Sequence, residues 1–165
     1  MIMNSFERLK AEIIRRGYEA NACDAIHDAE DADMMEAFFD VVKDNFNWCI
    51  YEGVIDIQMI EANKELFNDA NIYANEVHHG GYCLIDGDID TIGIAAYIYV
   101  CGNATVNKVF GNATVNKVFD NATVNYVSGN ATVNSLRYLS CLIKDNAVLR
   151  VLITNTLYTR MNVEF

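Results

Sequence analysis

The chain has 165 residues, of which 52% are hydrophobic, with no proline and five cysteines. This length suits one domain or two small ones, and the apolar and aromatic content argues against disorder. The net charge of −11 argues against direct binding of nucleic acid. No apolar run reaches the roughly 18 residues that span a bilayer, so we expect no membrane partner.

The charge is unevenly distributed along the chain. Residues 1–90 carry 20 acidic and 6 basic residues, a net charge of −14, whereas residues 91–165 carry 3 acidic and 6 basic residues, a net charge of +3. Near residues 78–81 the composition also changes, from charged helix formers to Val, Ile, Thr, Asn and Tyr. These changes predict an α+β protein with an acidic helical domain at 1–77 and a β-solenoid at 78–165.

The helical domain is predicted from apolar stripes at helical spacing. Asn4 or Ser5 caps a first helix that ends at Gly17, with the apolar stripe Phe6, Leu9, Ile13 and Ile14. Further helices are predicted at residues 23–30, 33–44 and 57–67, and residues 46–51 continue an apolar segment that we expect to end at Gly53. We interpret these stripes as core positions.

A run of eight acidic residues crosses the second and third predicted helices. It consists of Asp24, Asp28, Glu30, Asp31, Asp33, Glu36, Asp40 and Asp44. Such a run attracts and steers basic partners, so it is our candidate partner-binding surface. A solvated face that serves only solubility is the alternative.

The strongest pattern in the chain is a nine-residue repeat. Residues 102–110 read GNATVNKVF and 111–119 repeat this unchanged; DNATVNYVS follows at 120–128 and GNATVNSL at 129–136. Looser copies lie at 94–101, where Ala95, Tyr97 and Val100 match Ala104, Val106 and Val109, and at 145–151, displaced by two residues. A fixed period of this kind predicts a solenoid.

The side chains of one repeat alternate between the inside and outside of a strand. Ala104 and Val106 are predicted to face inward, and Asn103, Thr105 and Asn107 outward. Turns are expected at the Gly or Asp before each repeat and near Lys108. A coil of nine residues would have almost no interior, so we predict two repeats, or about 18 residues, per coil of a parallel β-roll.

This geometry predicts specific neighbours. Stacked side chains are expected at Val106 and Val124, Val115 and Val133, and Ala104 and Ala122, with amide ladders at Asn103 and Asn121 and at Asn112 and Asn130. The acidic helical domain is expected to cap one end of the solenoid. The tail, 137–165, is expected to continue the coils and close the other end, because open strand edges invite aggregation.

The repeat run GNATVNKVFGNATVNKVFDNATVNYVSGNATVN resembles the GNATV-type solenoid tracts in gut-bacterial mobile-element and phage proteins. Residues 41–75 are similar to the helical part that precedes those tracts, and NTLYTRMNVEF resembles their endings. The resemblance implies a nonapeptide β-solenoid and a phage or mobile-element setting. It implies no activity and no functional residues.

The cysteines give little support for chemistry. Cys23, Cys49, Cys83, Cys101 and Cys141 are widely spaced, odd in number and include no CxxC pair. We expect buried, reduced thiols in a cytoplasmic protein, because no signal-peptide core is visible at the start of the chain. Cys23 and His27, four residues apart, could pair on one helix face, but two packed core residues are the simpler interpretation.

A cation site is the second chemical candidate. His78 and His79 precede Asp86, Asp88 and Asp90, whose carboxylates would point the same way in an extended segment. The segment lacks the later glycine and glutamate of an EF-hand loop, and no repeat has the calcium-binding GGxGxD pattern. A solvated acidic turn is therefore the alternative, and we expect no cofactor.

Two further patterns on the repeats have simpler structural explanations. The N-A-T triplets match glycosylation acceptors but also suit ladder positions. The rows formed by Thr105 and Thr123 and by Thr114 and Thr132 could form an ice-binding surface, but Thr also suits any exposed strand. No phosphate-binding glycine motif occurs, and no spacing forms a catalytic set, so we predict a protein that is not an enzyme.

Two functions remain as expectations. The first is a non-catalytic interaction module whose acidic helical domain binds a basic host or phage protein, with inhibition of a nucleic-acid-binding factor as one form. The alternative is a structural scaffold in which the solenoid is a rigid spacer. The ends of the solenoid also allow a homodimer formed by end-to-end stacking of coils.

Overall fold

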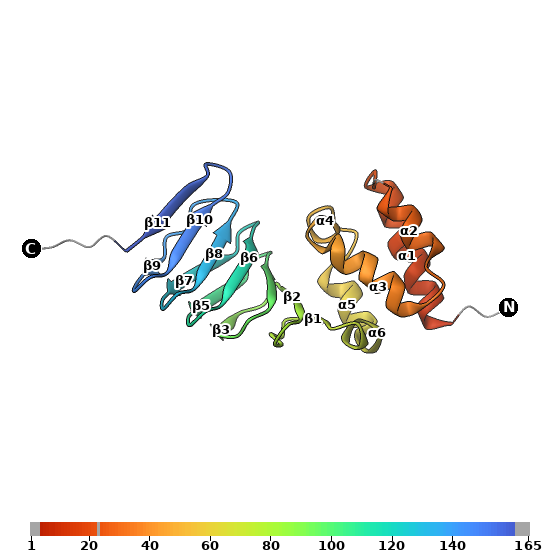
Figure 1. Ribbon diagram of the computed structural model, residues 1–165, viewed down its shortest axis with the longest axis horizontal. Helices are drawn as coiled ribbons and strands as arrows, with labels where there is room; N and C mark the ends of the chain where they lie inside the picture. Colours follow the sequence, from red (N-terminus) through yellow and green to blue (C-terminus); the bar gives the residue numbers. More distant parts are fainter. Residues whose placement is uncertain (1–3, 23, 161–165) are drawn as a thin grey trace, which may run out of the picture. The chain divides into compact units, whose positions relative to one another are not determined.

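The computed structural model describes residues 4–22 and 24–160. It divides into two units, Met1–Ala70 and Asn71–Phe165 (Figure 1). The first unit is helical and the second is a solenoid of parallel strands, so the expected α+β fold is confirmed. The division falls seven residues before the predicted one, because Ile72–Ala74 already pairs in the solenoid.

The helical unit contains α1 (Ser5–Glu19), α2 (Ala25–Asp31), α3 (Met35–Asp44), α4 (Phe46–Tyr51), α5 (Ile57–Ala62) and α6 (Lys64–Asp69). Asn4 caps α1 as predicted, since its side chain accepts a hydrogen bond from the Glu7 amide at 2.8 Å. The predicted stop at Gly17 is wrong. Gly17 lies buried inside α1, where a Cβ would come within 2.5 Å of the Ile26 side chain, so glycine permits close helix packing.

Aromatic rings form the centre of the helical core. The rings of Phe6, Phe38, Phe39 and Phe67 make consecutive edge-to-face contacts, with centroids 5.4 to 5.7 Å apart. Phe38, Phe39 and Phe67 are almost completely buried. The single helix predicted for 57–67 is instead two short helices, α5 and α6, which meet at Asn63.

The second unit contains eleven strands in its described part: β1 (Ile72–Ala74), β2 (Tyr82–Ile85), β3 (Ile89–Ile92), β4 (Tyr97–Val100), β5 (Thr105–Val109), β6 (Thr114–Val118), β7 (Thr123–Val127), β8 (Thr132–Ser135), β9 (Leu142–Ile143), β10 (Val148–Val151) and β11 (Thr156–Thr159). Sheet A has the order β1-β2-β4-β6-β8-β10-β11, and sheet B has the order β3-β5-β7-β9. Successive strands from β2 to β10 alternate between the two sheets, which makes about four coils (Figure 1). All pairs are parallel except β10 with β11.

The predicted coil length is confirmed within the repeats. Val106 pairs with Val124 and Val115 with Val133, each 18 residues later. The Thr123 amide donates to the Ala104 carbonyl oxygen at 2.9 Å, which places Ala122 next to Ala104. Outside the repeats the coils shorten, down to 15 residues between Tyr82 and Tyr97 in the first one.

The inward and outward positions follow the prediction, except near Lys108. Ala104 and Val106 are buried, whereas Asn103 and Asn107 are exposed. The turn expected near Lys108 is wrong, because β5 continues to Val109, which is also buried.

The turns fall at the residue before each Asn, as predicted. Gly102, Gly111, Asp120 and Gly129 all have positive φ, between 53° and 69°. Glycine adopts this conformation without strain, and Asp tolerates it better than most residues. At Gly129 a Cβ would also lie 3.0 Å from the Gly111 backbone, so this position requires glycine for space as well.

The predicted alignment with the regular repeats is correct for one degenerate copy and partly wrong for the other. Residues 145–151 continue the solenoid at a spacing of 16, as their two-residue displacement implies, with Leu149 paired to Val133. In the upstream copy Val100 pairs with Val118. The predicted equivalence of Tyr97 with the inward valines is wrong, because a register shift places Ile98 inside and leaves Tyr97 exposed.

Asparagine side chains form ladders along the turns. Asn121 donates to Asn103 at 3.4 Å and Asn130 to Asn112 at 3.2 Å, as predicted. Asn146 donates to Asn130 at 3.2 Å and extends the second ladder by one coil. The asparagines of the N-A-T triplets therefore have a structural role as members of these ladders.

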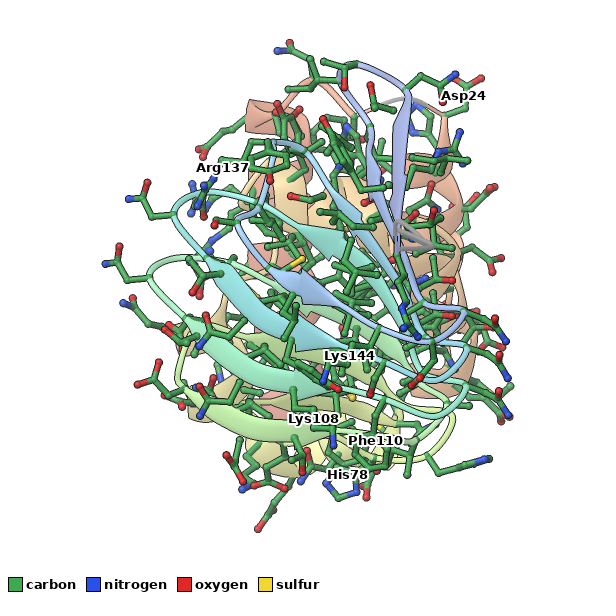
Figure 2. All side chains as sticks on the ribbon, turned by 90° about the vertical axis from the view of Figure 1, so that its left-hand side faces the viewer. Asp24, His78, Lys108, Phe110, Arg137 and Lys144 are labelled. Carbon is green, nitrogen blue, oxygen red and sulfur yellow. The ribbon has the colours of Figure 1, made fainter. Side chains whose placement is uncertain are left out.

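Arg137 replaces backbone donors where the regular repeats end. In the preceding coil the carbonyl oxygens of Gly102 and Ala104 accept from the amides of Asn121 and Thr123. One coil later, the equivalent carbonyl oxygens of Asp120 and Ala122 accept instead from Arg137 Nε at 2.9 Å and from Arg137 Nη2 at 3.0 Å. The Arg137 side chain is labelled in Figure 2. The guanidinium thus takes the place of two peptide N–H groups.

Replacement of Arg137 by methionine is expected to destabilise the solenoid by about 1–2 kcal/mol, because two carbonyl oxygens lose their donors at a partly hydrated turn. Urea unfolding followed by circular dichroism measures this change. Arg150→Met is the matched control, since Arg150 donates to the Asn155 side chain and, among the described residues, to no backbone carbonyl oxygen. Equal loss in both variants would contradict the assigned role.

Candidate functional site

The eight predicted partner-binding residues are all exposed and lie on or beside α2 and α3. Asp28, Glu30 and Asp31 belong to α2, and Asp24 precedes it. Glu36, Asp40 and Asp44 belong to α3, and Asp33 precedes that helix. The segment 24–44 carries these eight carboxylates and one lysine, Lys43, a net charge of −7.

Helical spacing aligns six of these eight carboxylates in two stripes. On α2, Asp24, Asp28 and Asp31 are four and three residues apart. On α3, Glu36, Asp40 and Asp44 are four residues apart. Residues at these spacings are neighbours on one helix face. Because α2 packs against α3, the two stripes belong to one packed helix pair.

Two of the three acidic residues of α1, Glu12 and Glu19, form ion pairs with arginines of the same helix. Glu12 lies 2.8 Å from Arg15 and 2.8 Å from Arg16, and Arg16 also pairs with Asp56 at 2.7 Å. Hydrogen bonds from Arg15 and then Arg16 lower the pKa of Glu12 to about 2. The helix α1 carries three acidic and four basic residues, so its own charge is close to balanced.

The carboxylates of α2 and α3 mostly lack such partners. Asp40 pairs with Lys43 at 2.8 Å, and Glu30 lies 3.3 Å from His27 Nδ1. The other six have no ion pair with any residue in 4–22 or 24–160: Asp24, Asp28, Asp31, Asp33, Glu36 and Asp44. Together these eight side chains, called the acidic face below, form an exposed and largely uncompensated anionic surface.

Glu30, a member of the acidic face, contacts Tyr18 of α1. The Tyr18 hydroxyl donates to Glu30 Oε2 at 2.7 Å and lowers the pKa of that carboxyl group. His27 lies beside the same carboxylate and is exposed. Cys23, the other half of the pair considered above, lies outside the described residues.

The four described cysteines are free thiols. Cys49 and Cys83 are buried as expected, whereas Cys101 and Cys141 are only half-buried. Burial raises the pKa of Cys49 and of Cys101 to about 12. These thiols are therefore protonated at neutral pH and poor nucleophiles.

Asp86, Asp88 and Asp90 bond to the protein's own donors. Asp86 accepts from the Asn75 side chain at 2.9 Å, and Asp88 accepts from the Thr105 amide at 3.0 Å. Asp90 accepts from the Asn107 side chain at 3.3 Å, and Asn125 in turn donates to Asn107 at 3.0 Å. Asp90 is thus the acceptor that begins an amide ladder.

No group of three potential metal ligands exists within residues 4–22 and 24–160. His78 stacks on Tyr73, with centroids 3.7 Å apart, and its Nε2 lies 3.0 Å from Glu76 Oε2. The arrangement of the His78 and aspartate side chains therefore favours the structural interpretation of this segment over a cation site.

A row of cations and rings on sheet B was not predicted. Lys108 Nζ lies 5.2 Å from the Phe110 ring and 5.4 Å from the Tyr126 ring, and Lys144 Nζ lies 5.8 Å from Tyr126 (Figure 2). The sequence signal was the variable repeat position, since a spacing of 18 residues places Lys108 next to Tyr126. Contacts of this kind stabilise the outer surface of neighbouring coils.

Within the described residues, no helix has both the length and the apolar character that a membrane crossing requires. Comparison with known proteins finds no matching family model, no matching curated protein and no matching solved structure.

Proposed function

We propose that this protein is a non-catalytic interaction protein whose acidic face binds a basic partner protein. The observation that carries the proposal is the contrast between α1, where Glu12 and Glu19 pair with arginines, and the acidic face, of which six members have no described counter-ion. A phage or mobile-element setting, implied by the repeat resemblance, makes a basic host or phage protein the expected partner.

The positions of two carboxylates support a role other than stability. Asp31 is the last residue of α2 and Asp44 the last residue of α3. A negative charge at a helix C-terminus opposes the helix dipole, at a cost of about 0.3–1 kcal/mol. Like charges four residues apart, as at Glu36 and Asp40, cost a further few tenths of a kcal/mol. A basic partner would reduce both the unfavourable helix-dipole interaction and the repulsion between like charges.

The charge density of the acidic face also suggests what effect binding would have on the partner. A surface of this kind accelerates association with a basic protein and competes with the phosphates that such a protein otherwise binds. Inhibition of a nucleic-acid-binding factor is therefore the form of the proposal that we favour. Its binding should weaken strongly with salt, because the carboxylates are exposed.

The test reverses the two helix-terminal charges. Asp31→Lys with Asp44→Lys places cations at helix C-termini, where the dipole favours them. Lys10 already donates to the Glu30 and Ala32 carbonyl oxygens beside Asp31, so circular dichroism checks that the variant is folded. Partner binding at low salt is expected to fall roughly tenfold or more. Affinity capture from bacterial lysate at low salt and at roughly 0.5 M salt, quantified by mass spectrometry, measures the loss.

The matched control reverses two exposed carboxylates at the ends of other helices. Glu52 follows α4 and Asp69 ends α6, and both lie outside the acidic face. Glu52→Lys with Asp69→Lys changes the net charge equally and should leave capture unchanged. Retention of every captured protein by the Asp31 and Asp44 variant would contradict the proposal.

The alternative function is a rigid spacer. The regular register of the repeats allows a test, because one whole coil can be removed. Removal of residues 111–128 deletes β6 and β7 and joins Phe110 to Gly129, which restores the Phe-Gly junction of the parent chain. Used as a further arm of the same experiment, this variant should bind the partner normally if the acidic face is responsible. Loss of binding with coil number, but not with charge reversal, would favour the spacer.

A further inference from the structure

The last coil of the solenoid is complete on one side only. Sheet A continues past β8 with β10 and β11, whereas sheet B ends at β9. Among the described residues, sheet B therefore has no strand after β9. The predicted closure by the tail is achieved in sheet A, where β11 turns back antiparallel to β10 (Figure 1).

This difference leaves a hollow of about 560 Å³ at the end of the solenoid. Its floor includes Leu149, which pairs with Val133 in the interior column, and Leu139, both almost fully buried. Leu142 of β9 is 55% exposed beside them, and Tyr158 of β11 lines the facing wall. The hollow is lined by these apolar side chains together with Lys144 and Arg160.

An unpaired strand edge borders the hollow. β9 pairs with β7 on one side and with no described strand on the other. The outermost strand of sheet A, β11, reads TLYT and contains no charge and no proline. Proteins usually protect edge strands with charged residues or proline, because unprotected edges pair with other chains.

Two cations lie at one corner of the hollow. Lys144 directly follows β9, and Arg160 directly follows β11. The pairing of Val148 with Thr159 carries Arg160 to the turn between β9 and β10, where Lys144 lies. Neither cation has an ion pair with another described residue. An acidic group on a bound segment would be favoured there.

We propose that this end of the solenoid binds an extended peptide segment of a partner protein, which adds as a parallel strand to β9. Alternate apolar side chains of the peptide enter the hollow, and an acidic residue at its C-terminal end meets Lys144 and Arg160. A parallel direction follows the other neighbours in sheet B, all of which are parallel. This mode of recognition uses backbone hydrogen bonds and alternating pockets.

A second copy of the chain fits this end less well. Two copies paired through β11 would continue sheet A but would leave sheet B without a strand after β9 in each copy. The apolar hollow would then remain unfilled, at a cost in lost packing. The proposal concerns the solenoid alone and does not depend on the acidic face.

The test uses the full chain and a fluorescein-labelled peptide, TVTVTVE, with TVTVTVK as its charge control. Fluorescence anisotropy is expected to show saturable binding of TVTVTVE at least tenfold tighter than that of TVTVTVK. Lys144→Glu with Arg160→Glu should reverse this preference. Absence of saturable binding, or equal binding of both peptides, would overturn the proposal.

Two further measurements locate the binding. Leu142→Asp should abolish it, whereas Ile153→Asp, an exposed apolar residue that does not line the hollow, should not. Both residues are exposed, so neither variant should unfold, which circular dichroism checks. The peptide should also slow amide hydrogen exchange at Ile143, because the Lys144 amide already donates to the Val127 carbonyl oxygen on the β7 side. Slowing only elsewhere, or equal loss of binding in both variants, would place the peptide at another site.

Discussion

Replacement of Val115 by aspartate is expected to unfold the solenoid unit. Val115 is fully buried and lies in an interior column between Ile98 and Val133. The core around it is built from aliphatic residues and small side chains, so a carboxylate would find no cation. The expected cost is at least about 4–5 kcal/mol, which is most of the stability of a typical domain.

The neighbouring residue provides the matched control for Val115. Thr114 is in the same strand, but its side chain points outward and is exposed. Thr114→Asp should change the free energy of unfolding by less than about 0.5 kcal/mol. Urea unfolding followed by circular dichroism near 215 nm compares the two variants. A native-like unfolding midpoint for Val115→Asp would contradict the inward assignment of the repeat valines.

The coil architecture was predictable because its determinants are local and repeated. Strand alternation assigns Ala104 and Val106 to the interior, and a nine-residue coil has too little space for them. Both considerations hold for any strand of this composition, so the pairing of Val106 with Val124 followed from the sequence. The Asn ladders followed from the same spacing.

Strict alternation fails where a strand bends. Val106 and Val109 are both buried although they are three positions apart, so the two residues between them, Asn107 and Lys108, both face outward. The chain thereby curves around the core within one strand, which a two-residue period cannot describe. The same limitation misplaced Tyr97, because a register shift beside it changes which residue faces inward.

The acidic face was visible in the sequence, but its electrostatic state was not. Glu12 and Asp31 are both acidic residues of predicted helices. Glu12 forms ion pairs with Arg15 and Arg16, whereas Asp31 has no described counter-ion. Such a difference depends on which side chains the packing of the helices brings together. Similarly, the half-closed end of the solenoid depends on how many strands each sheet receives, which composition cannot indicate.

The helical unit should be most sensitive to the loss of Phe38. Its ring contacts Phe6 and Phe39 at centroid distances of 5.7 and 5.5 Å and has no exposed surface. Phe38→Ala is expected to cost about 3–5 kcal/mol, because three short turns of α3 cannot collapse into a cavity bounded by other rings. Thermal unfolding monitored at 222 nm measures the loss.

Met34→Ala is the control for Phe38→Ala. Met34 lies beside the start of the same helix and is 67% exposed, so its replacement should change stability by less than about 0.5 kcal/mol. If both variants melt at the parent temperature, the aromatic cluster does not hold the helices together, and the acidic face would lack a rigid support.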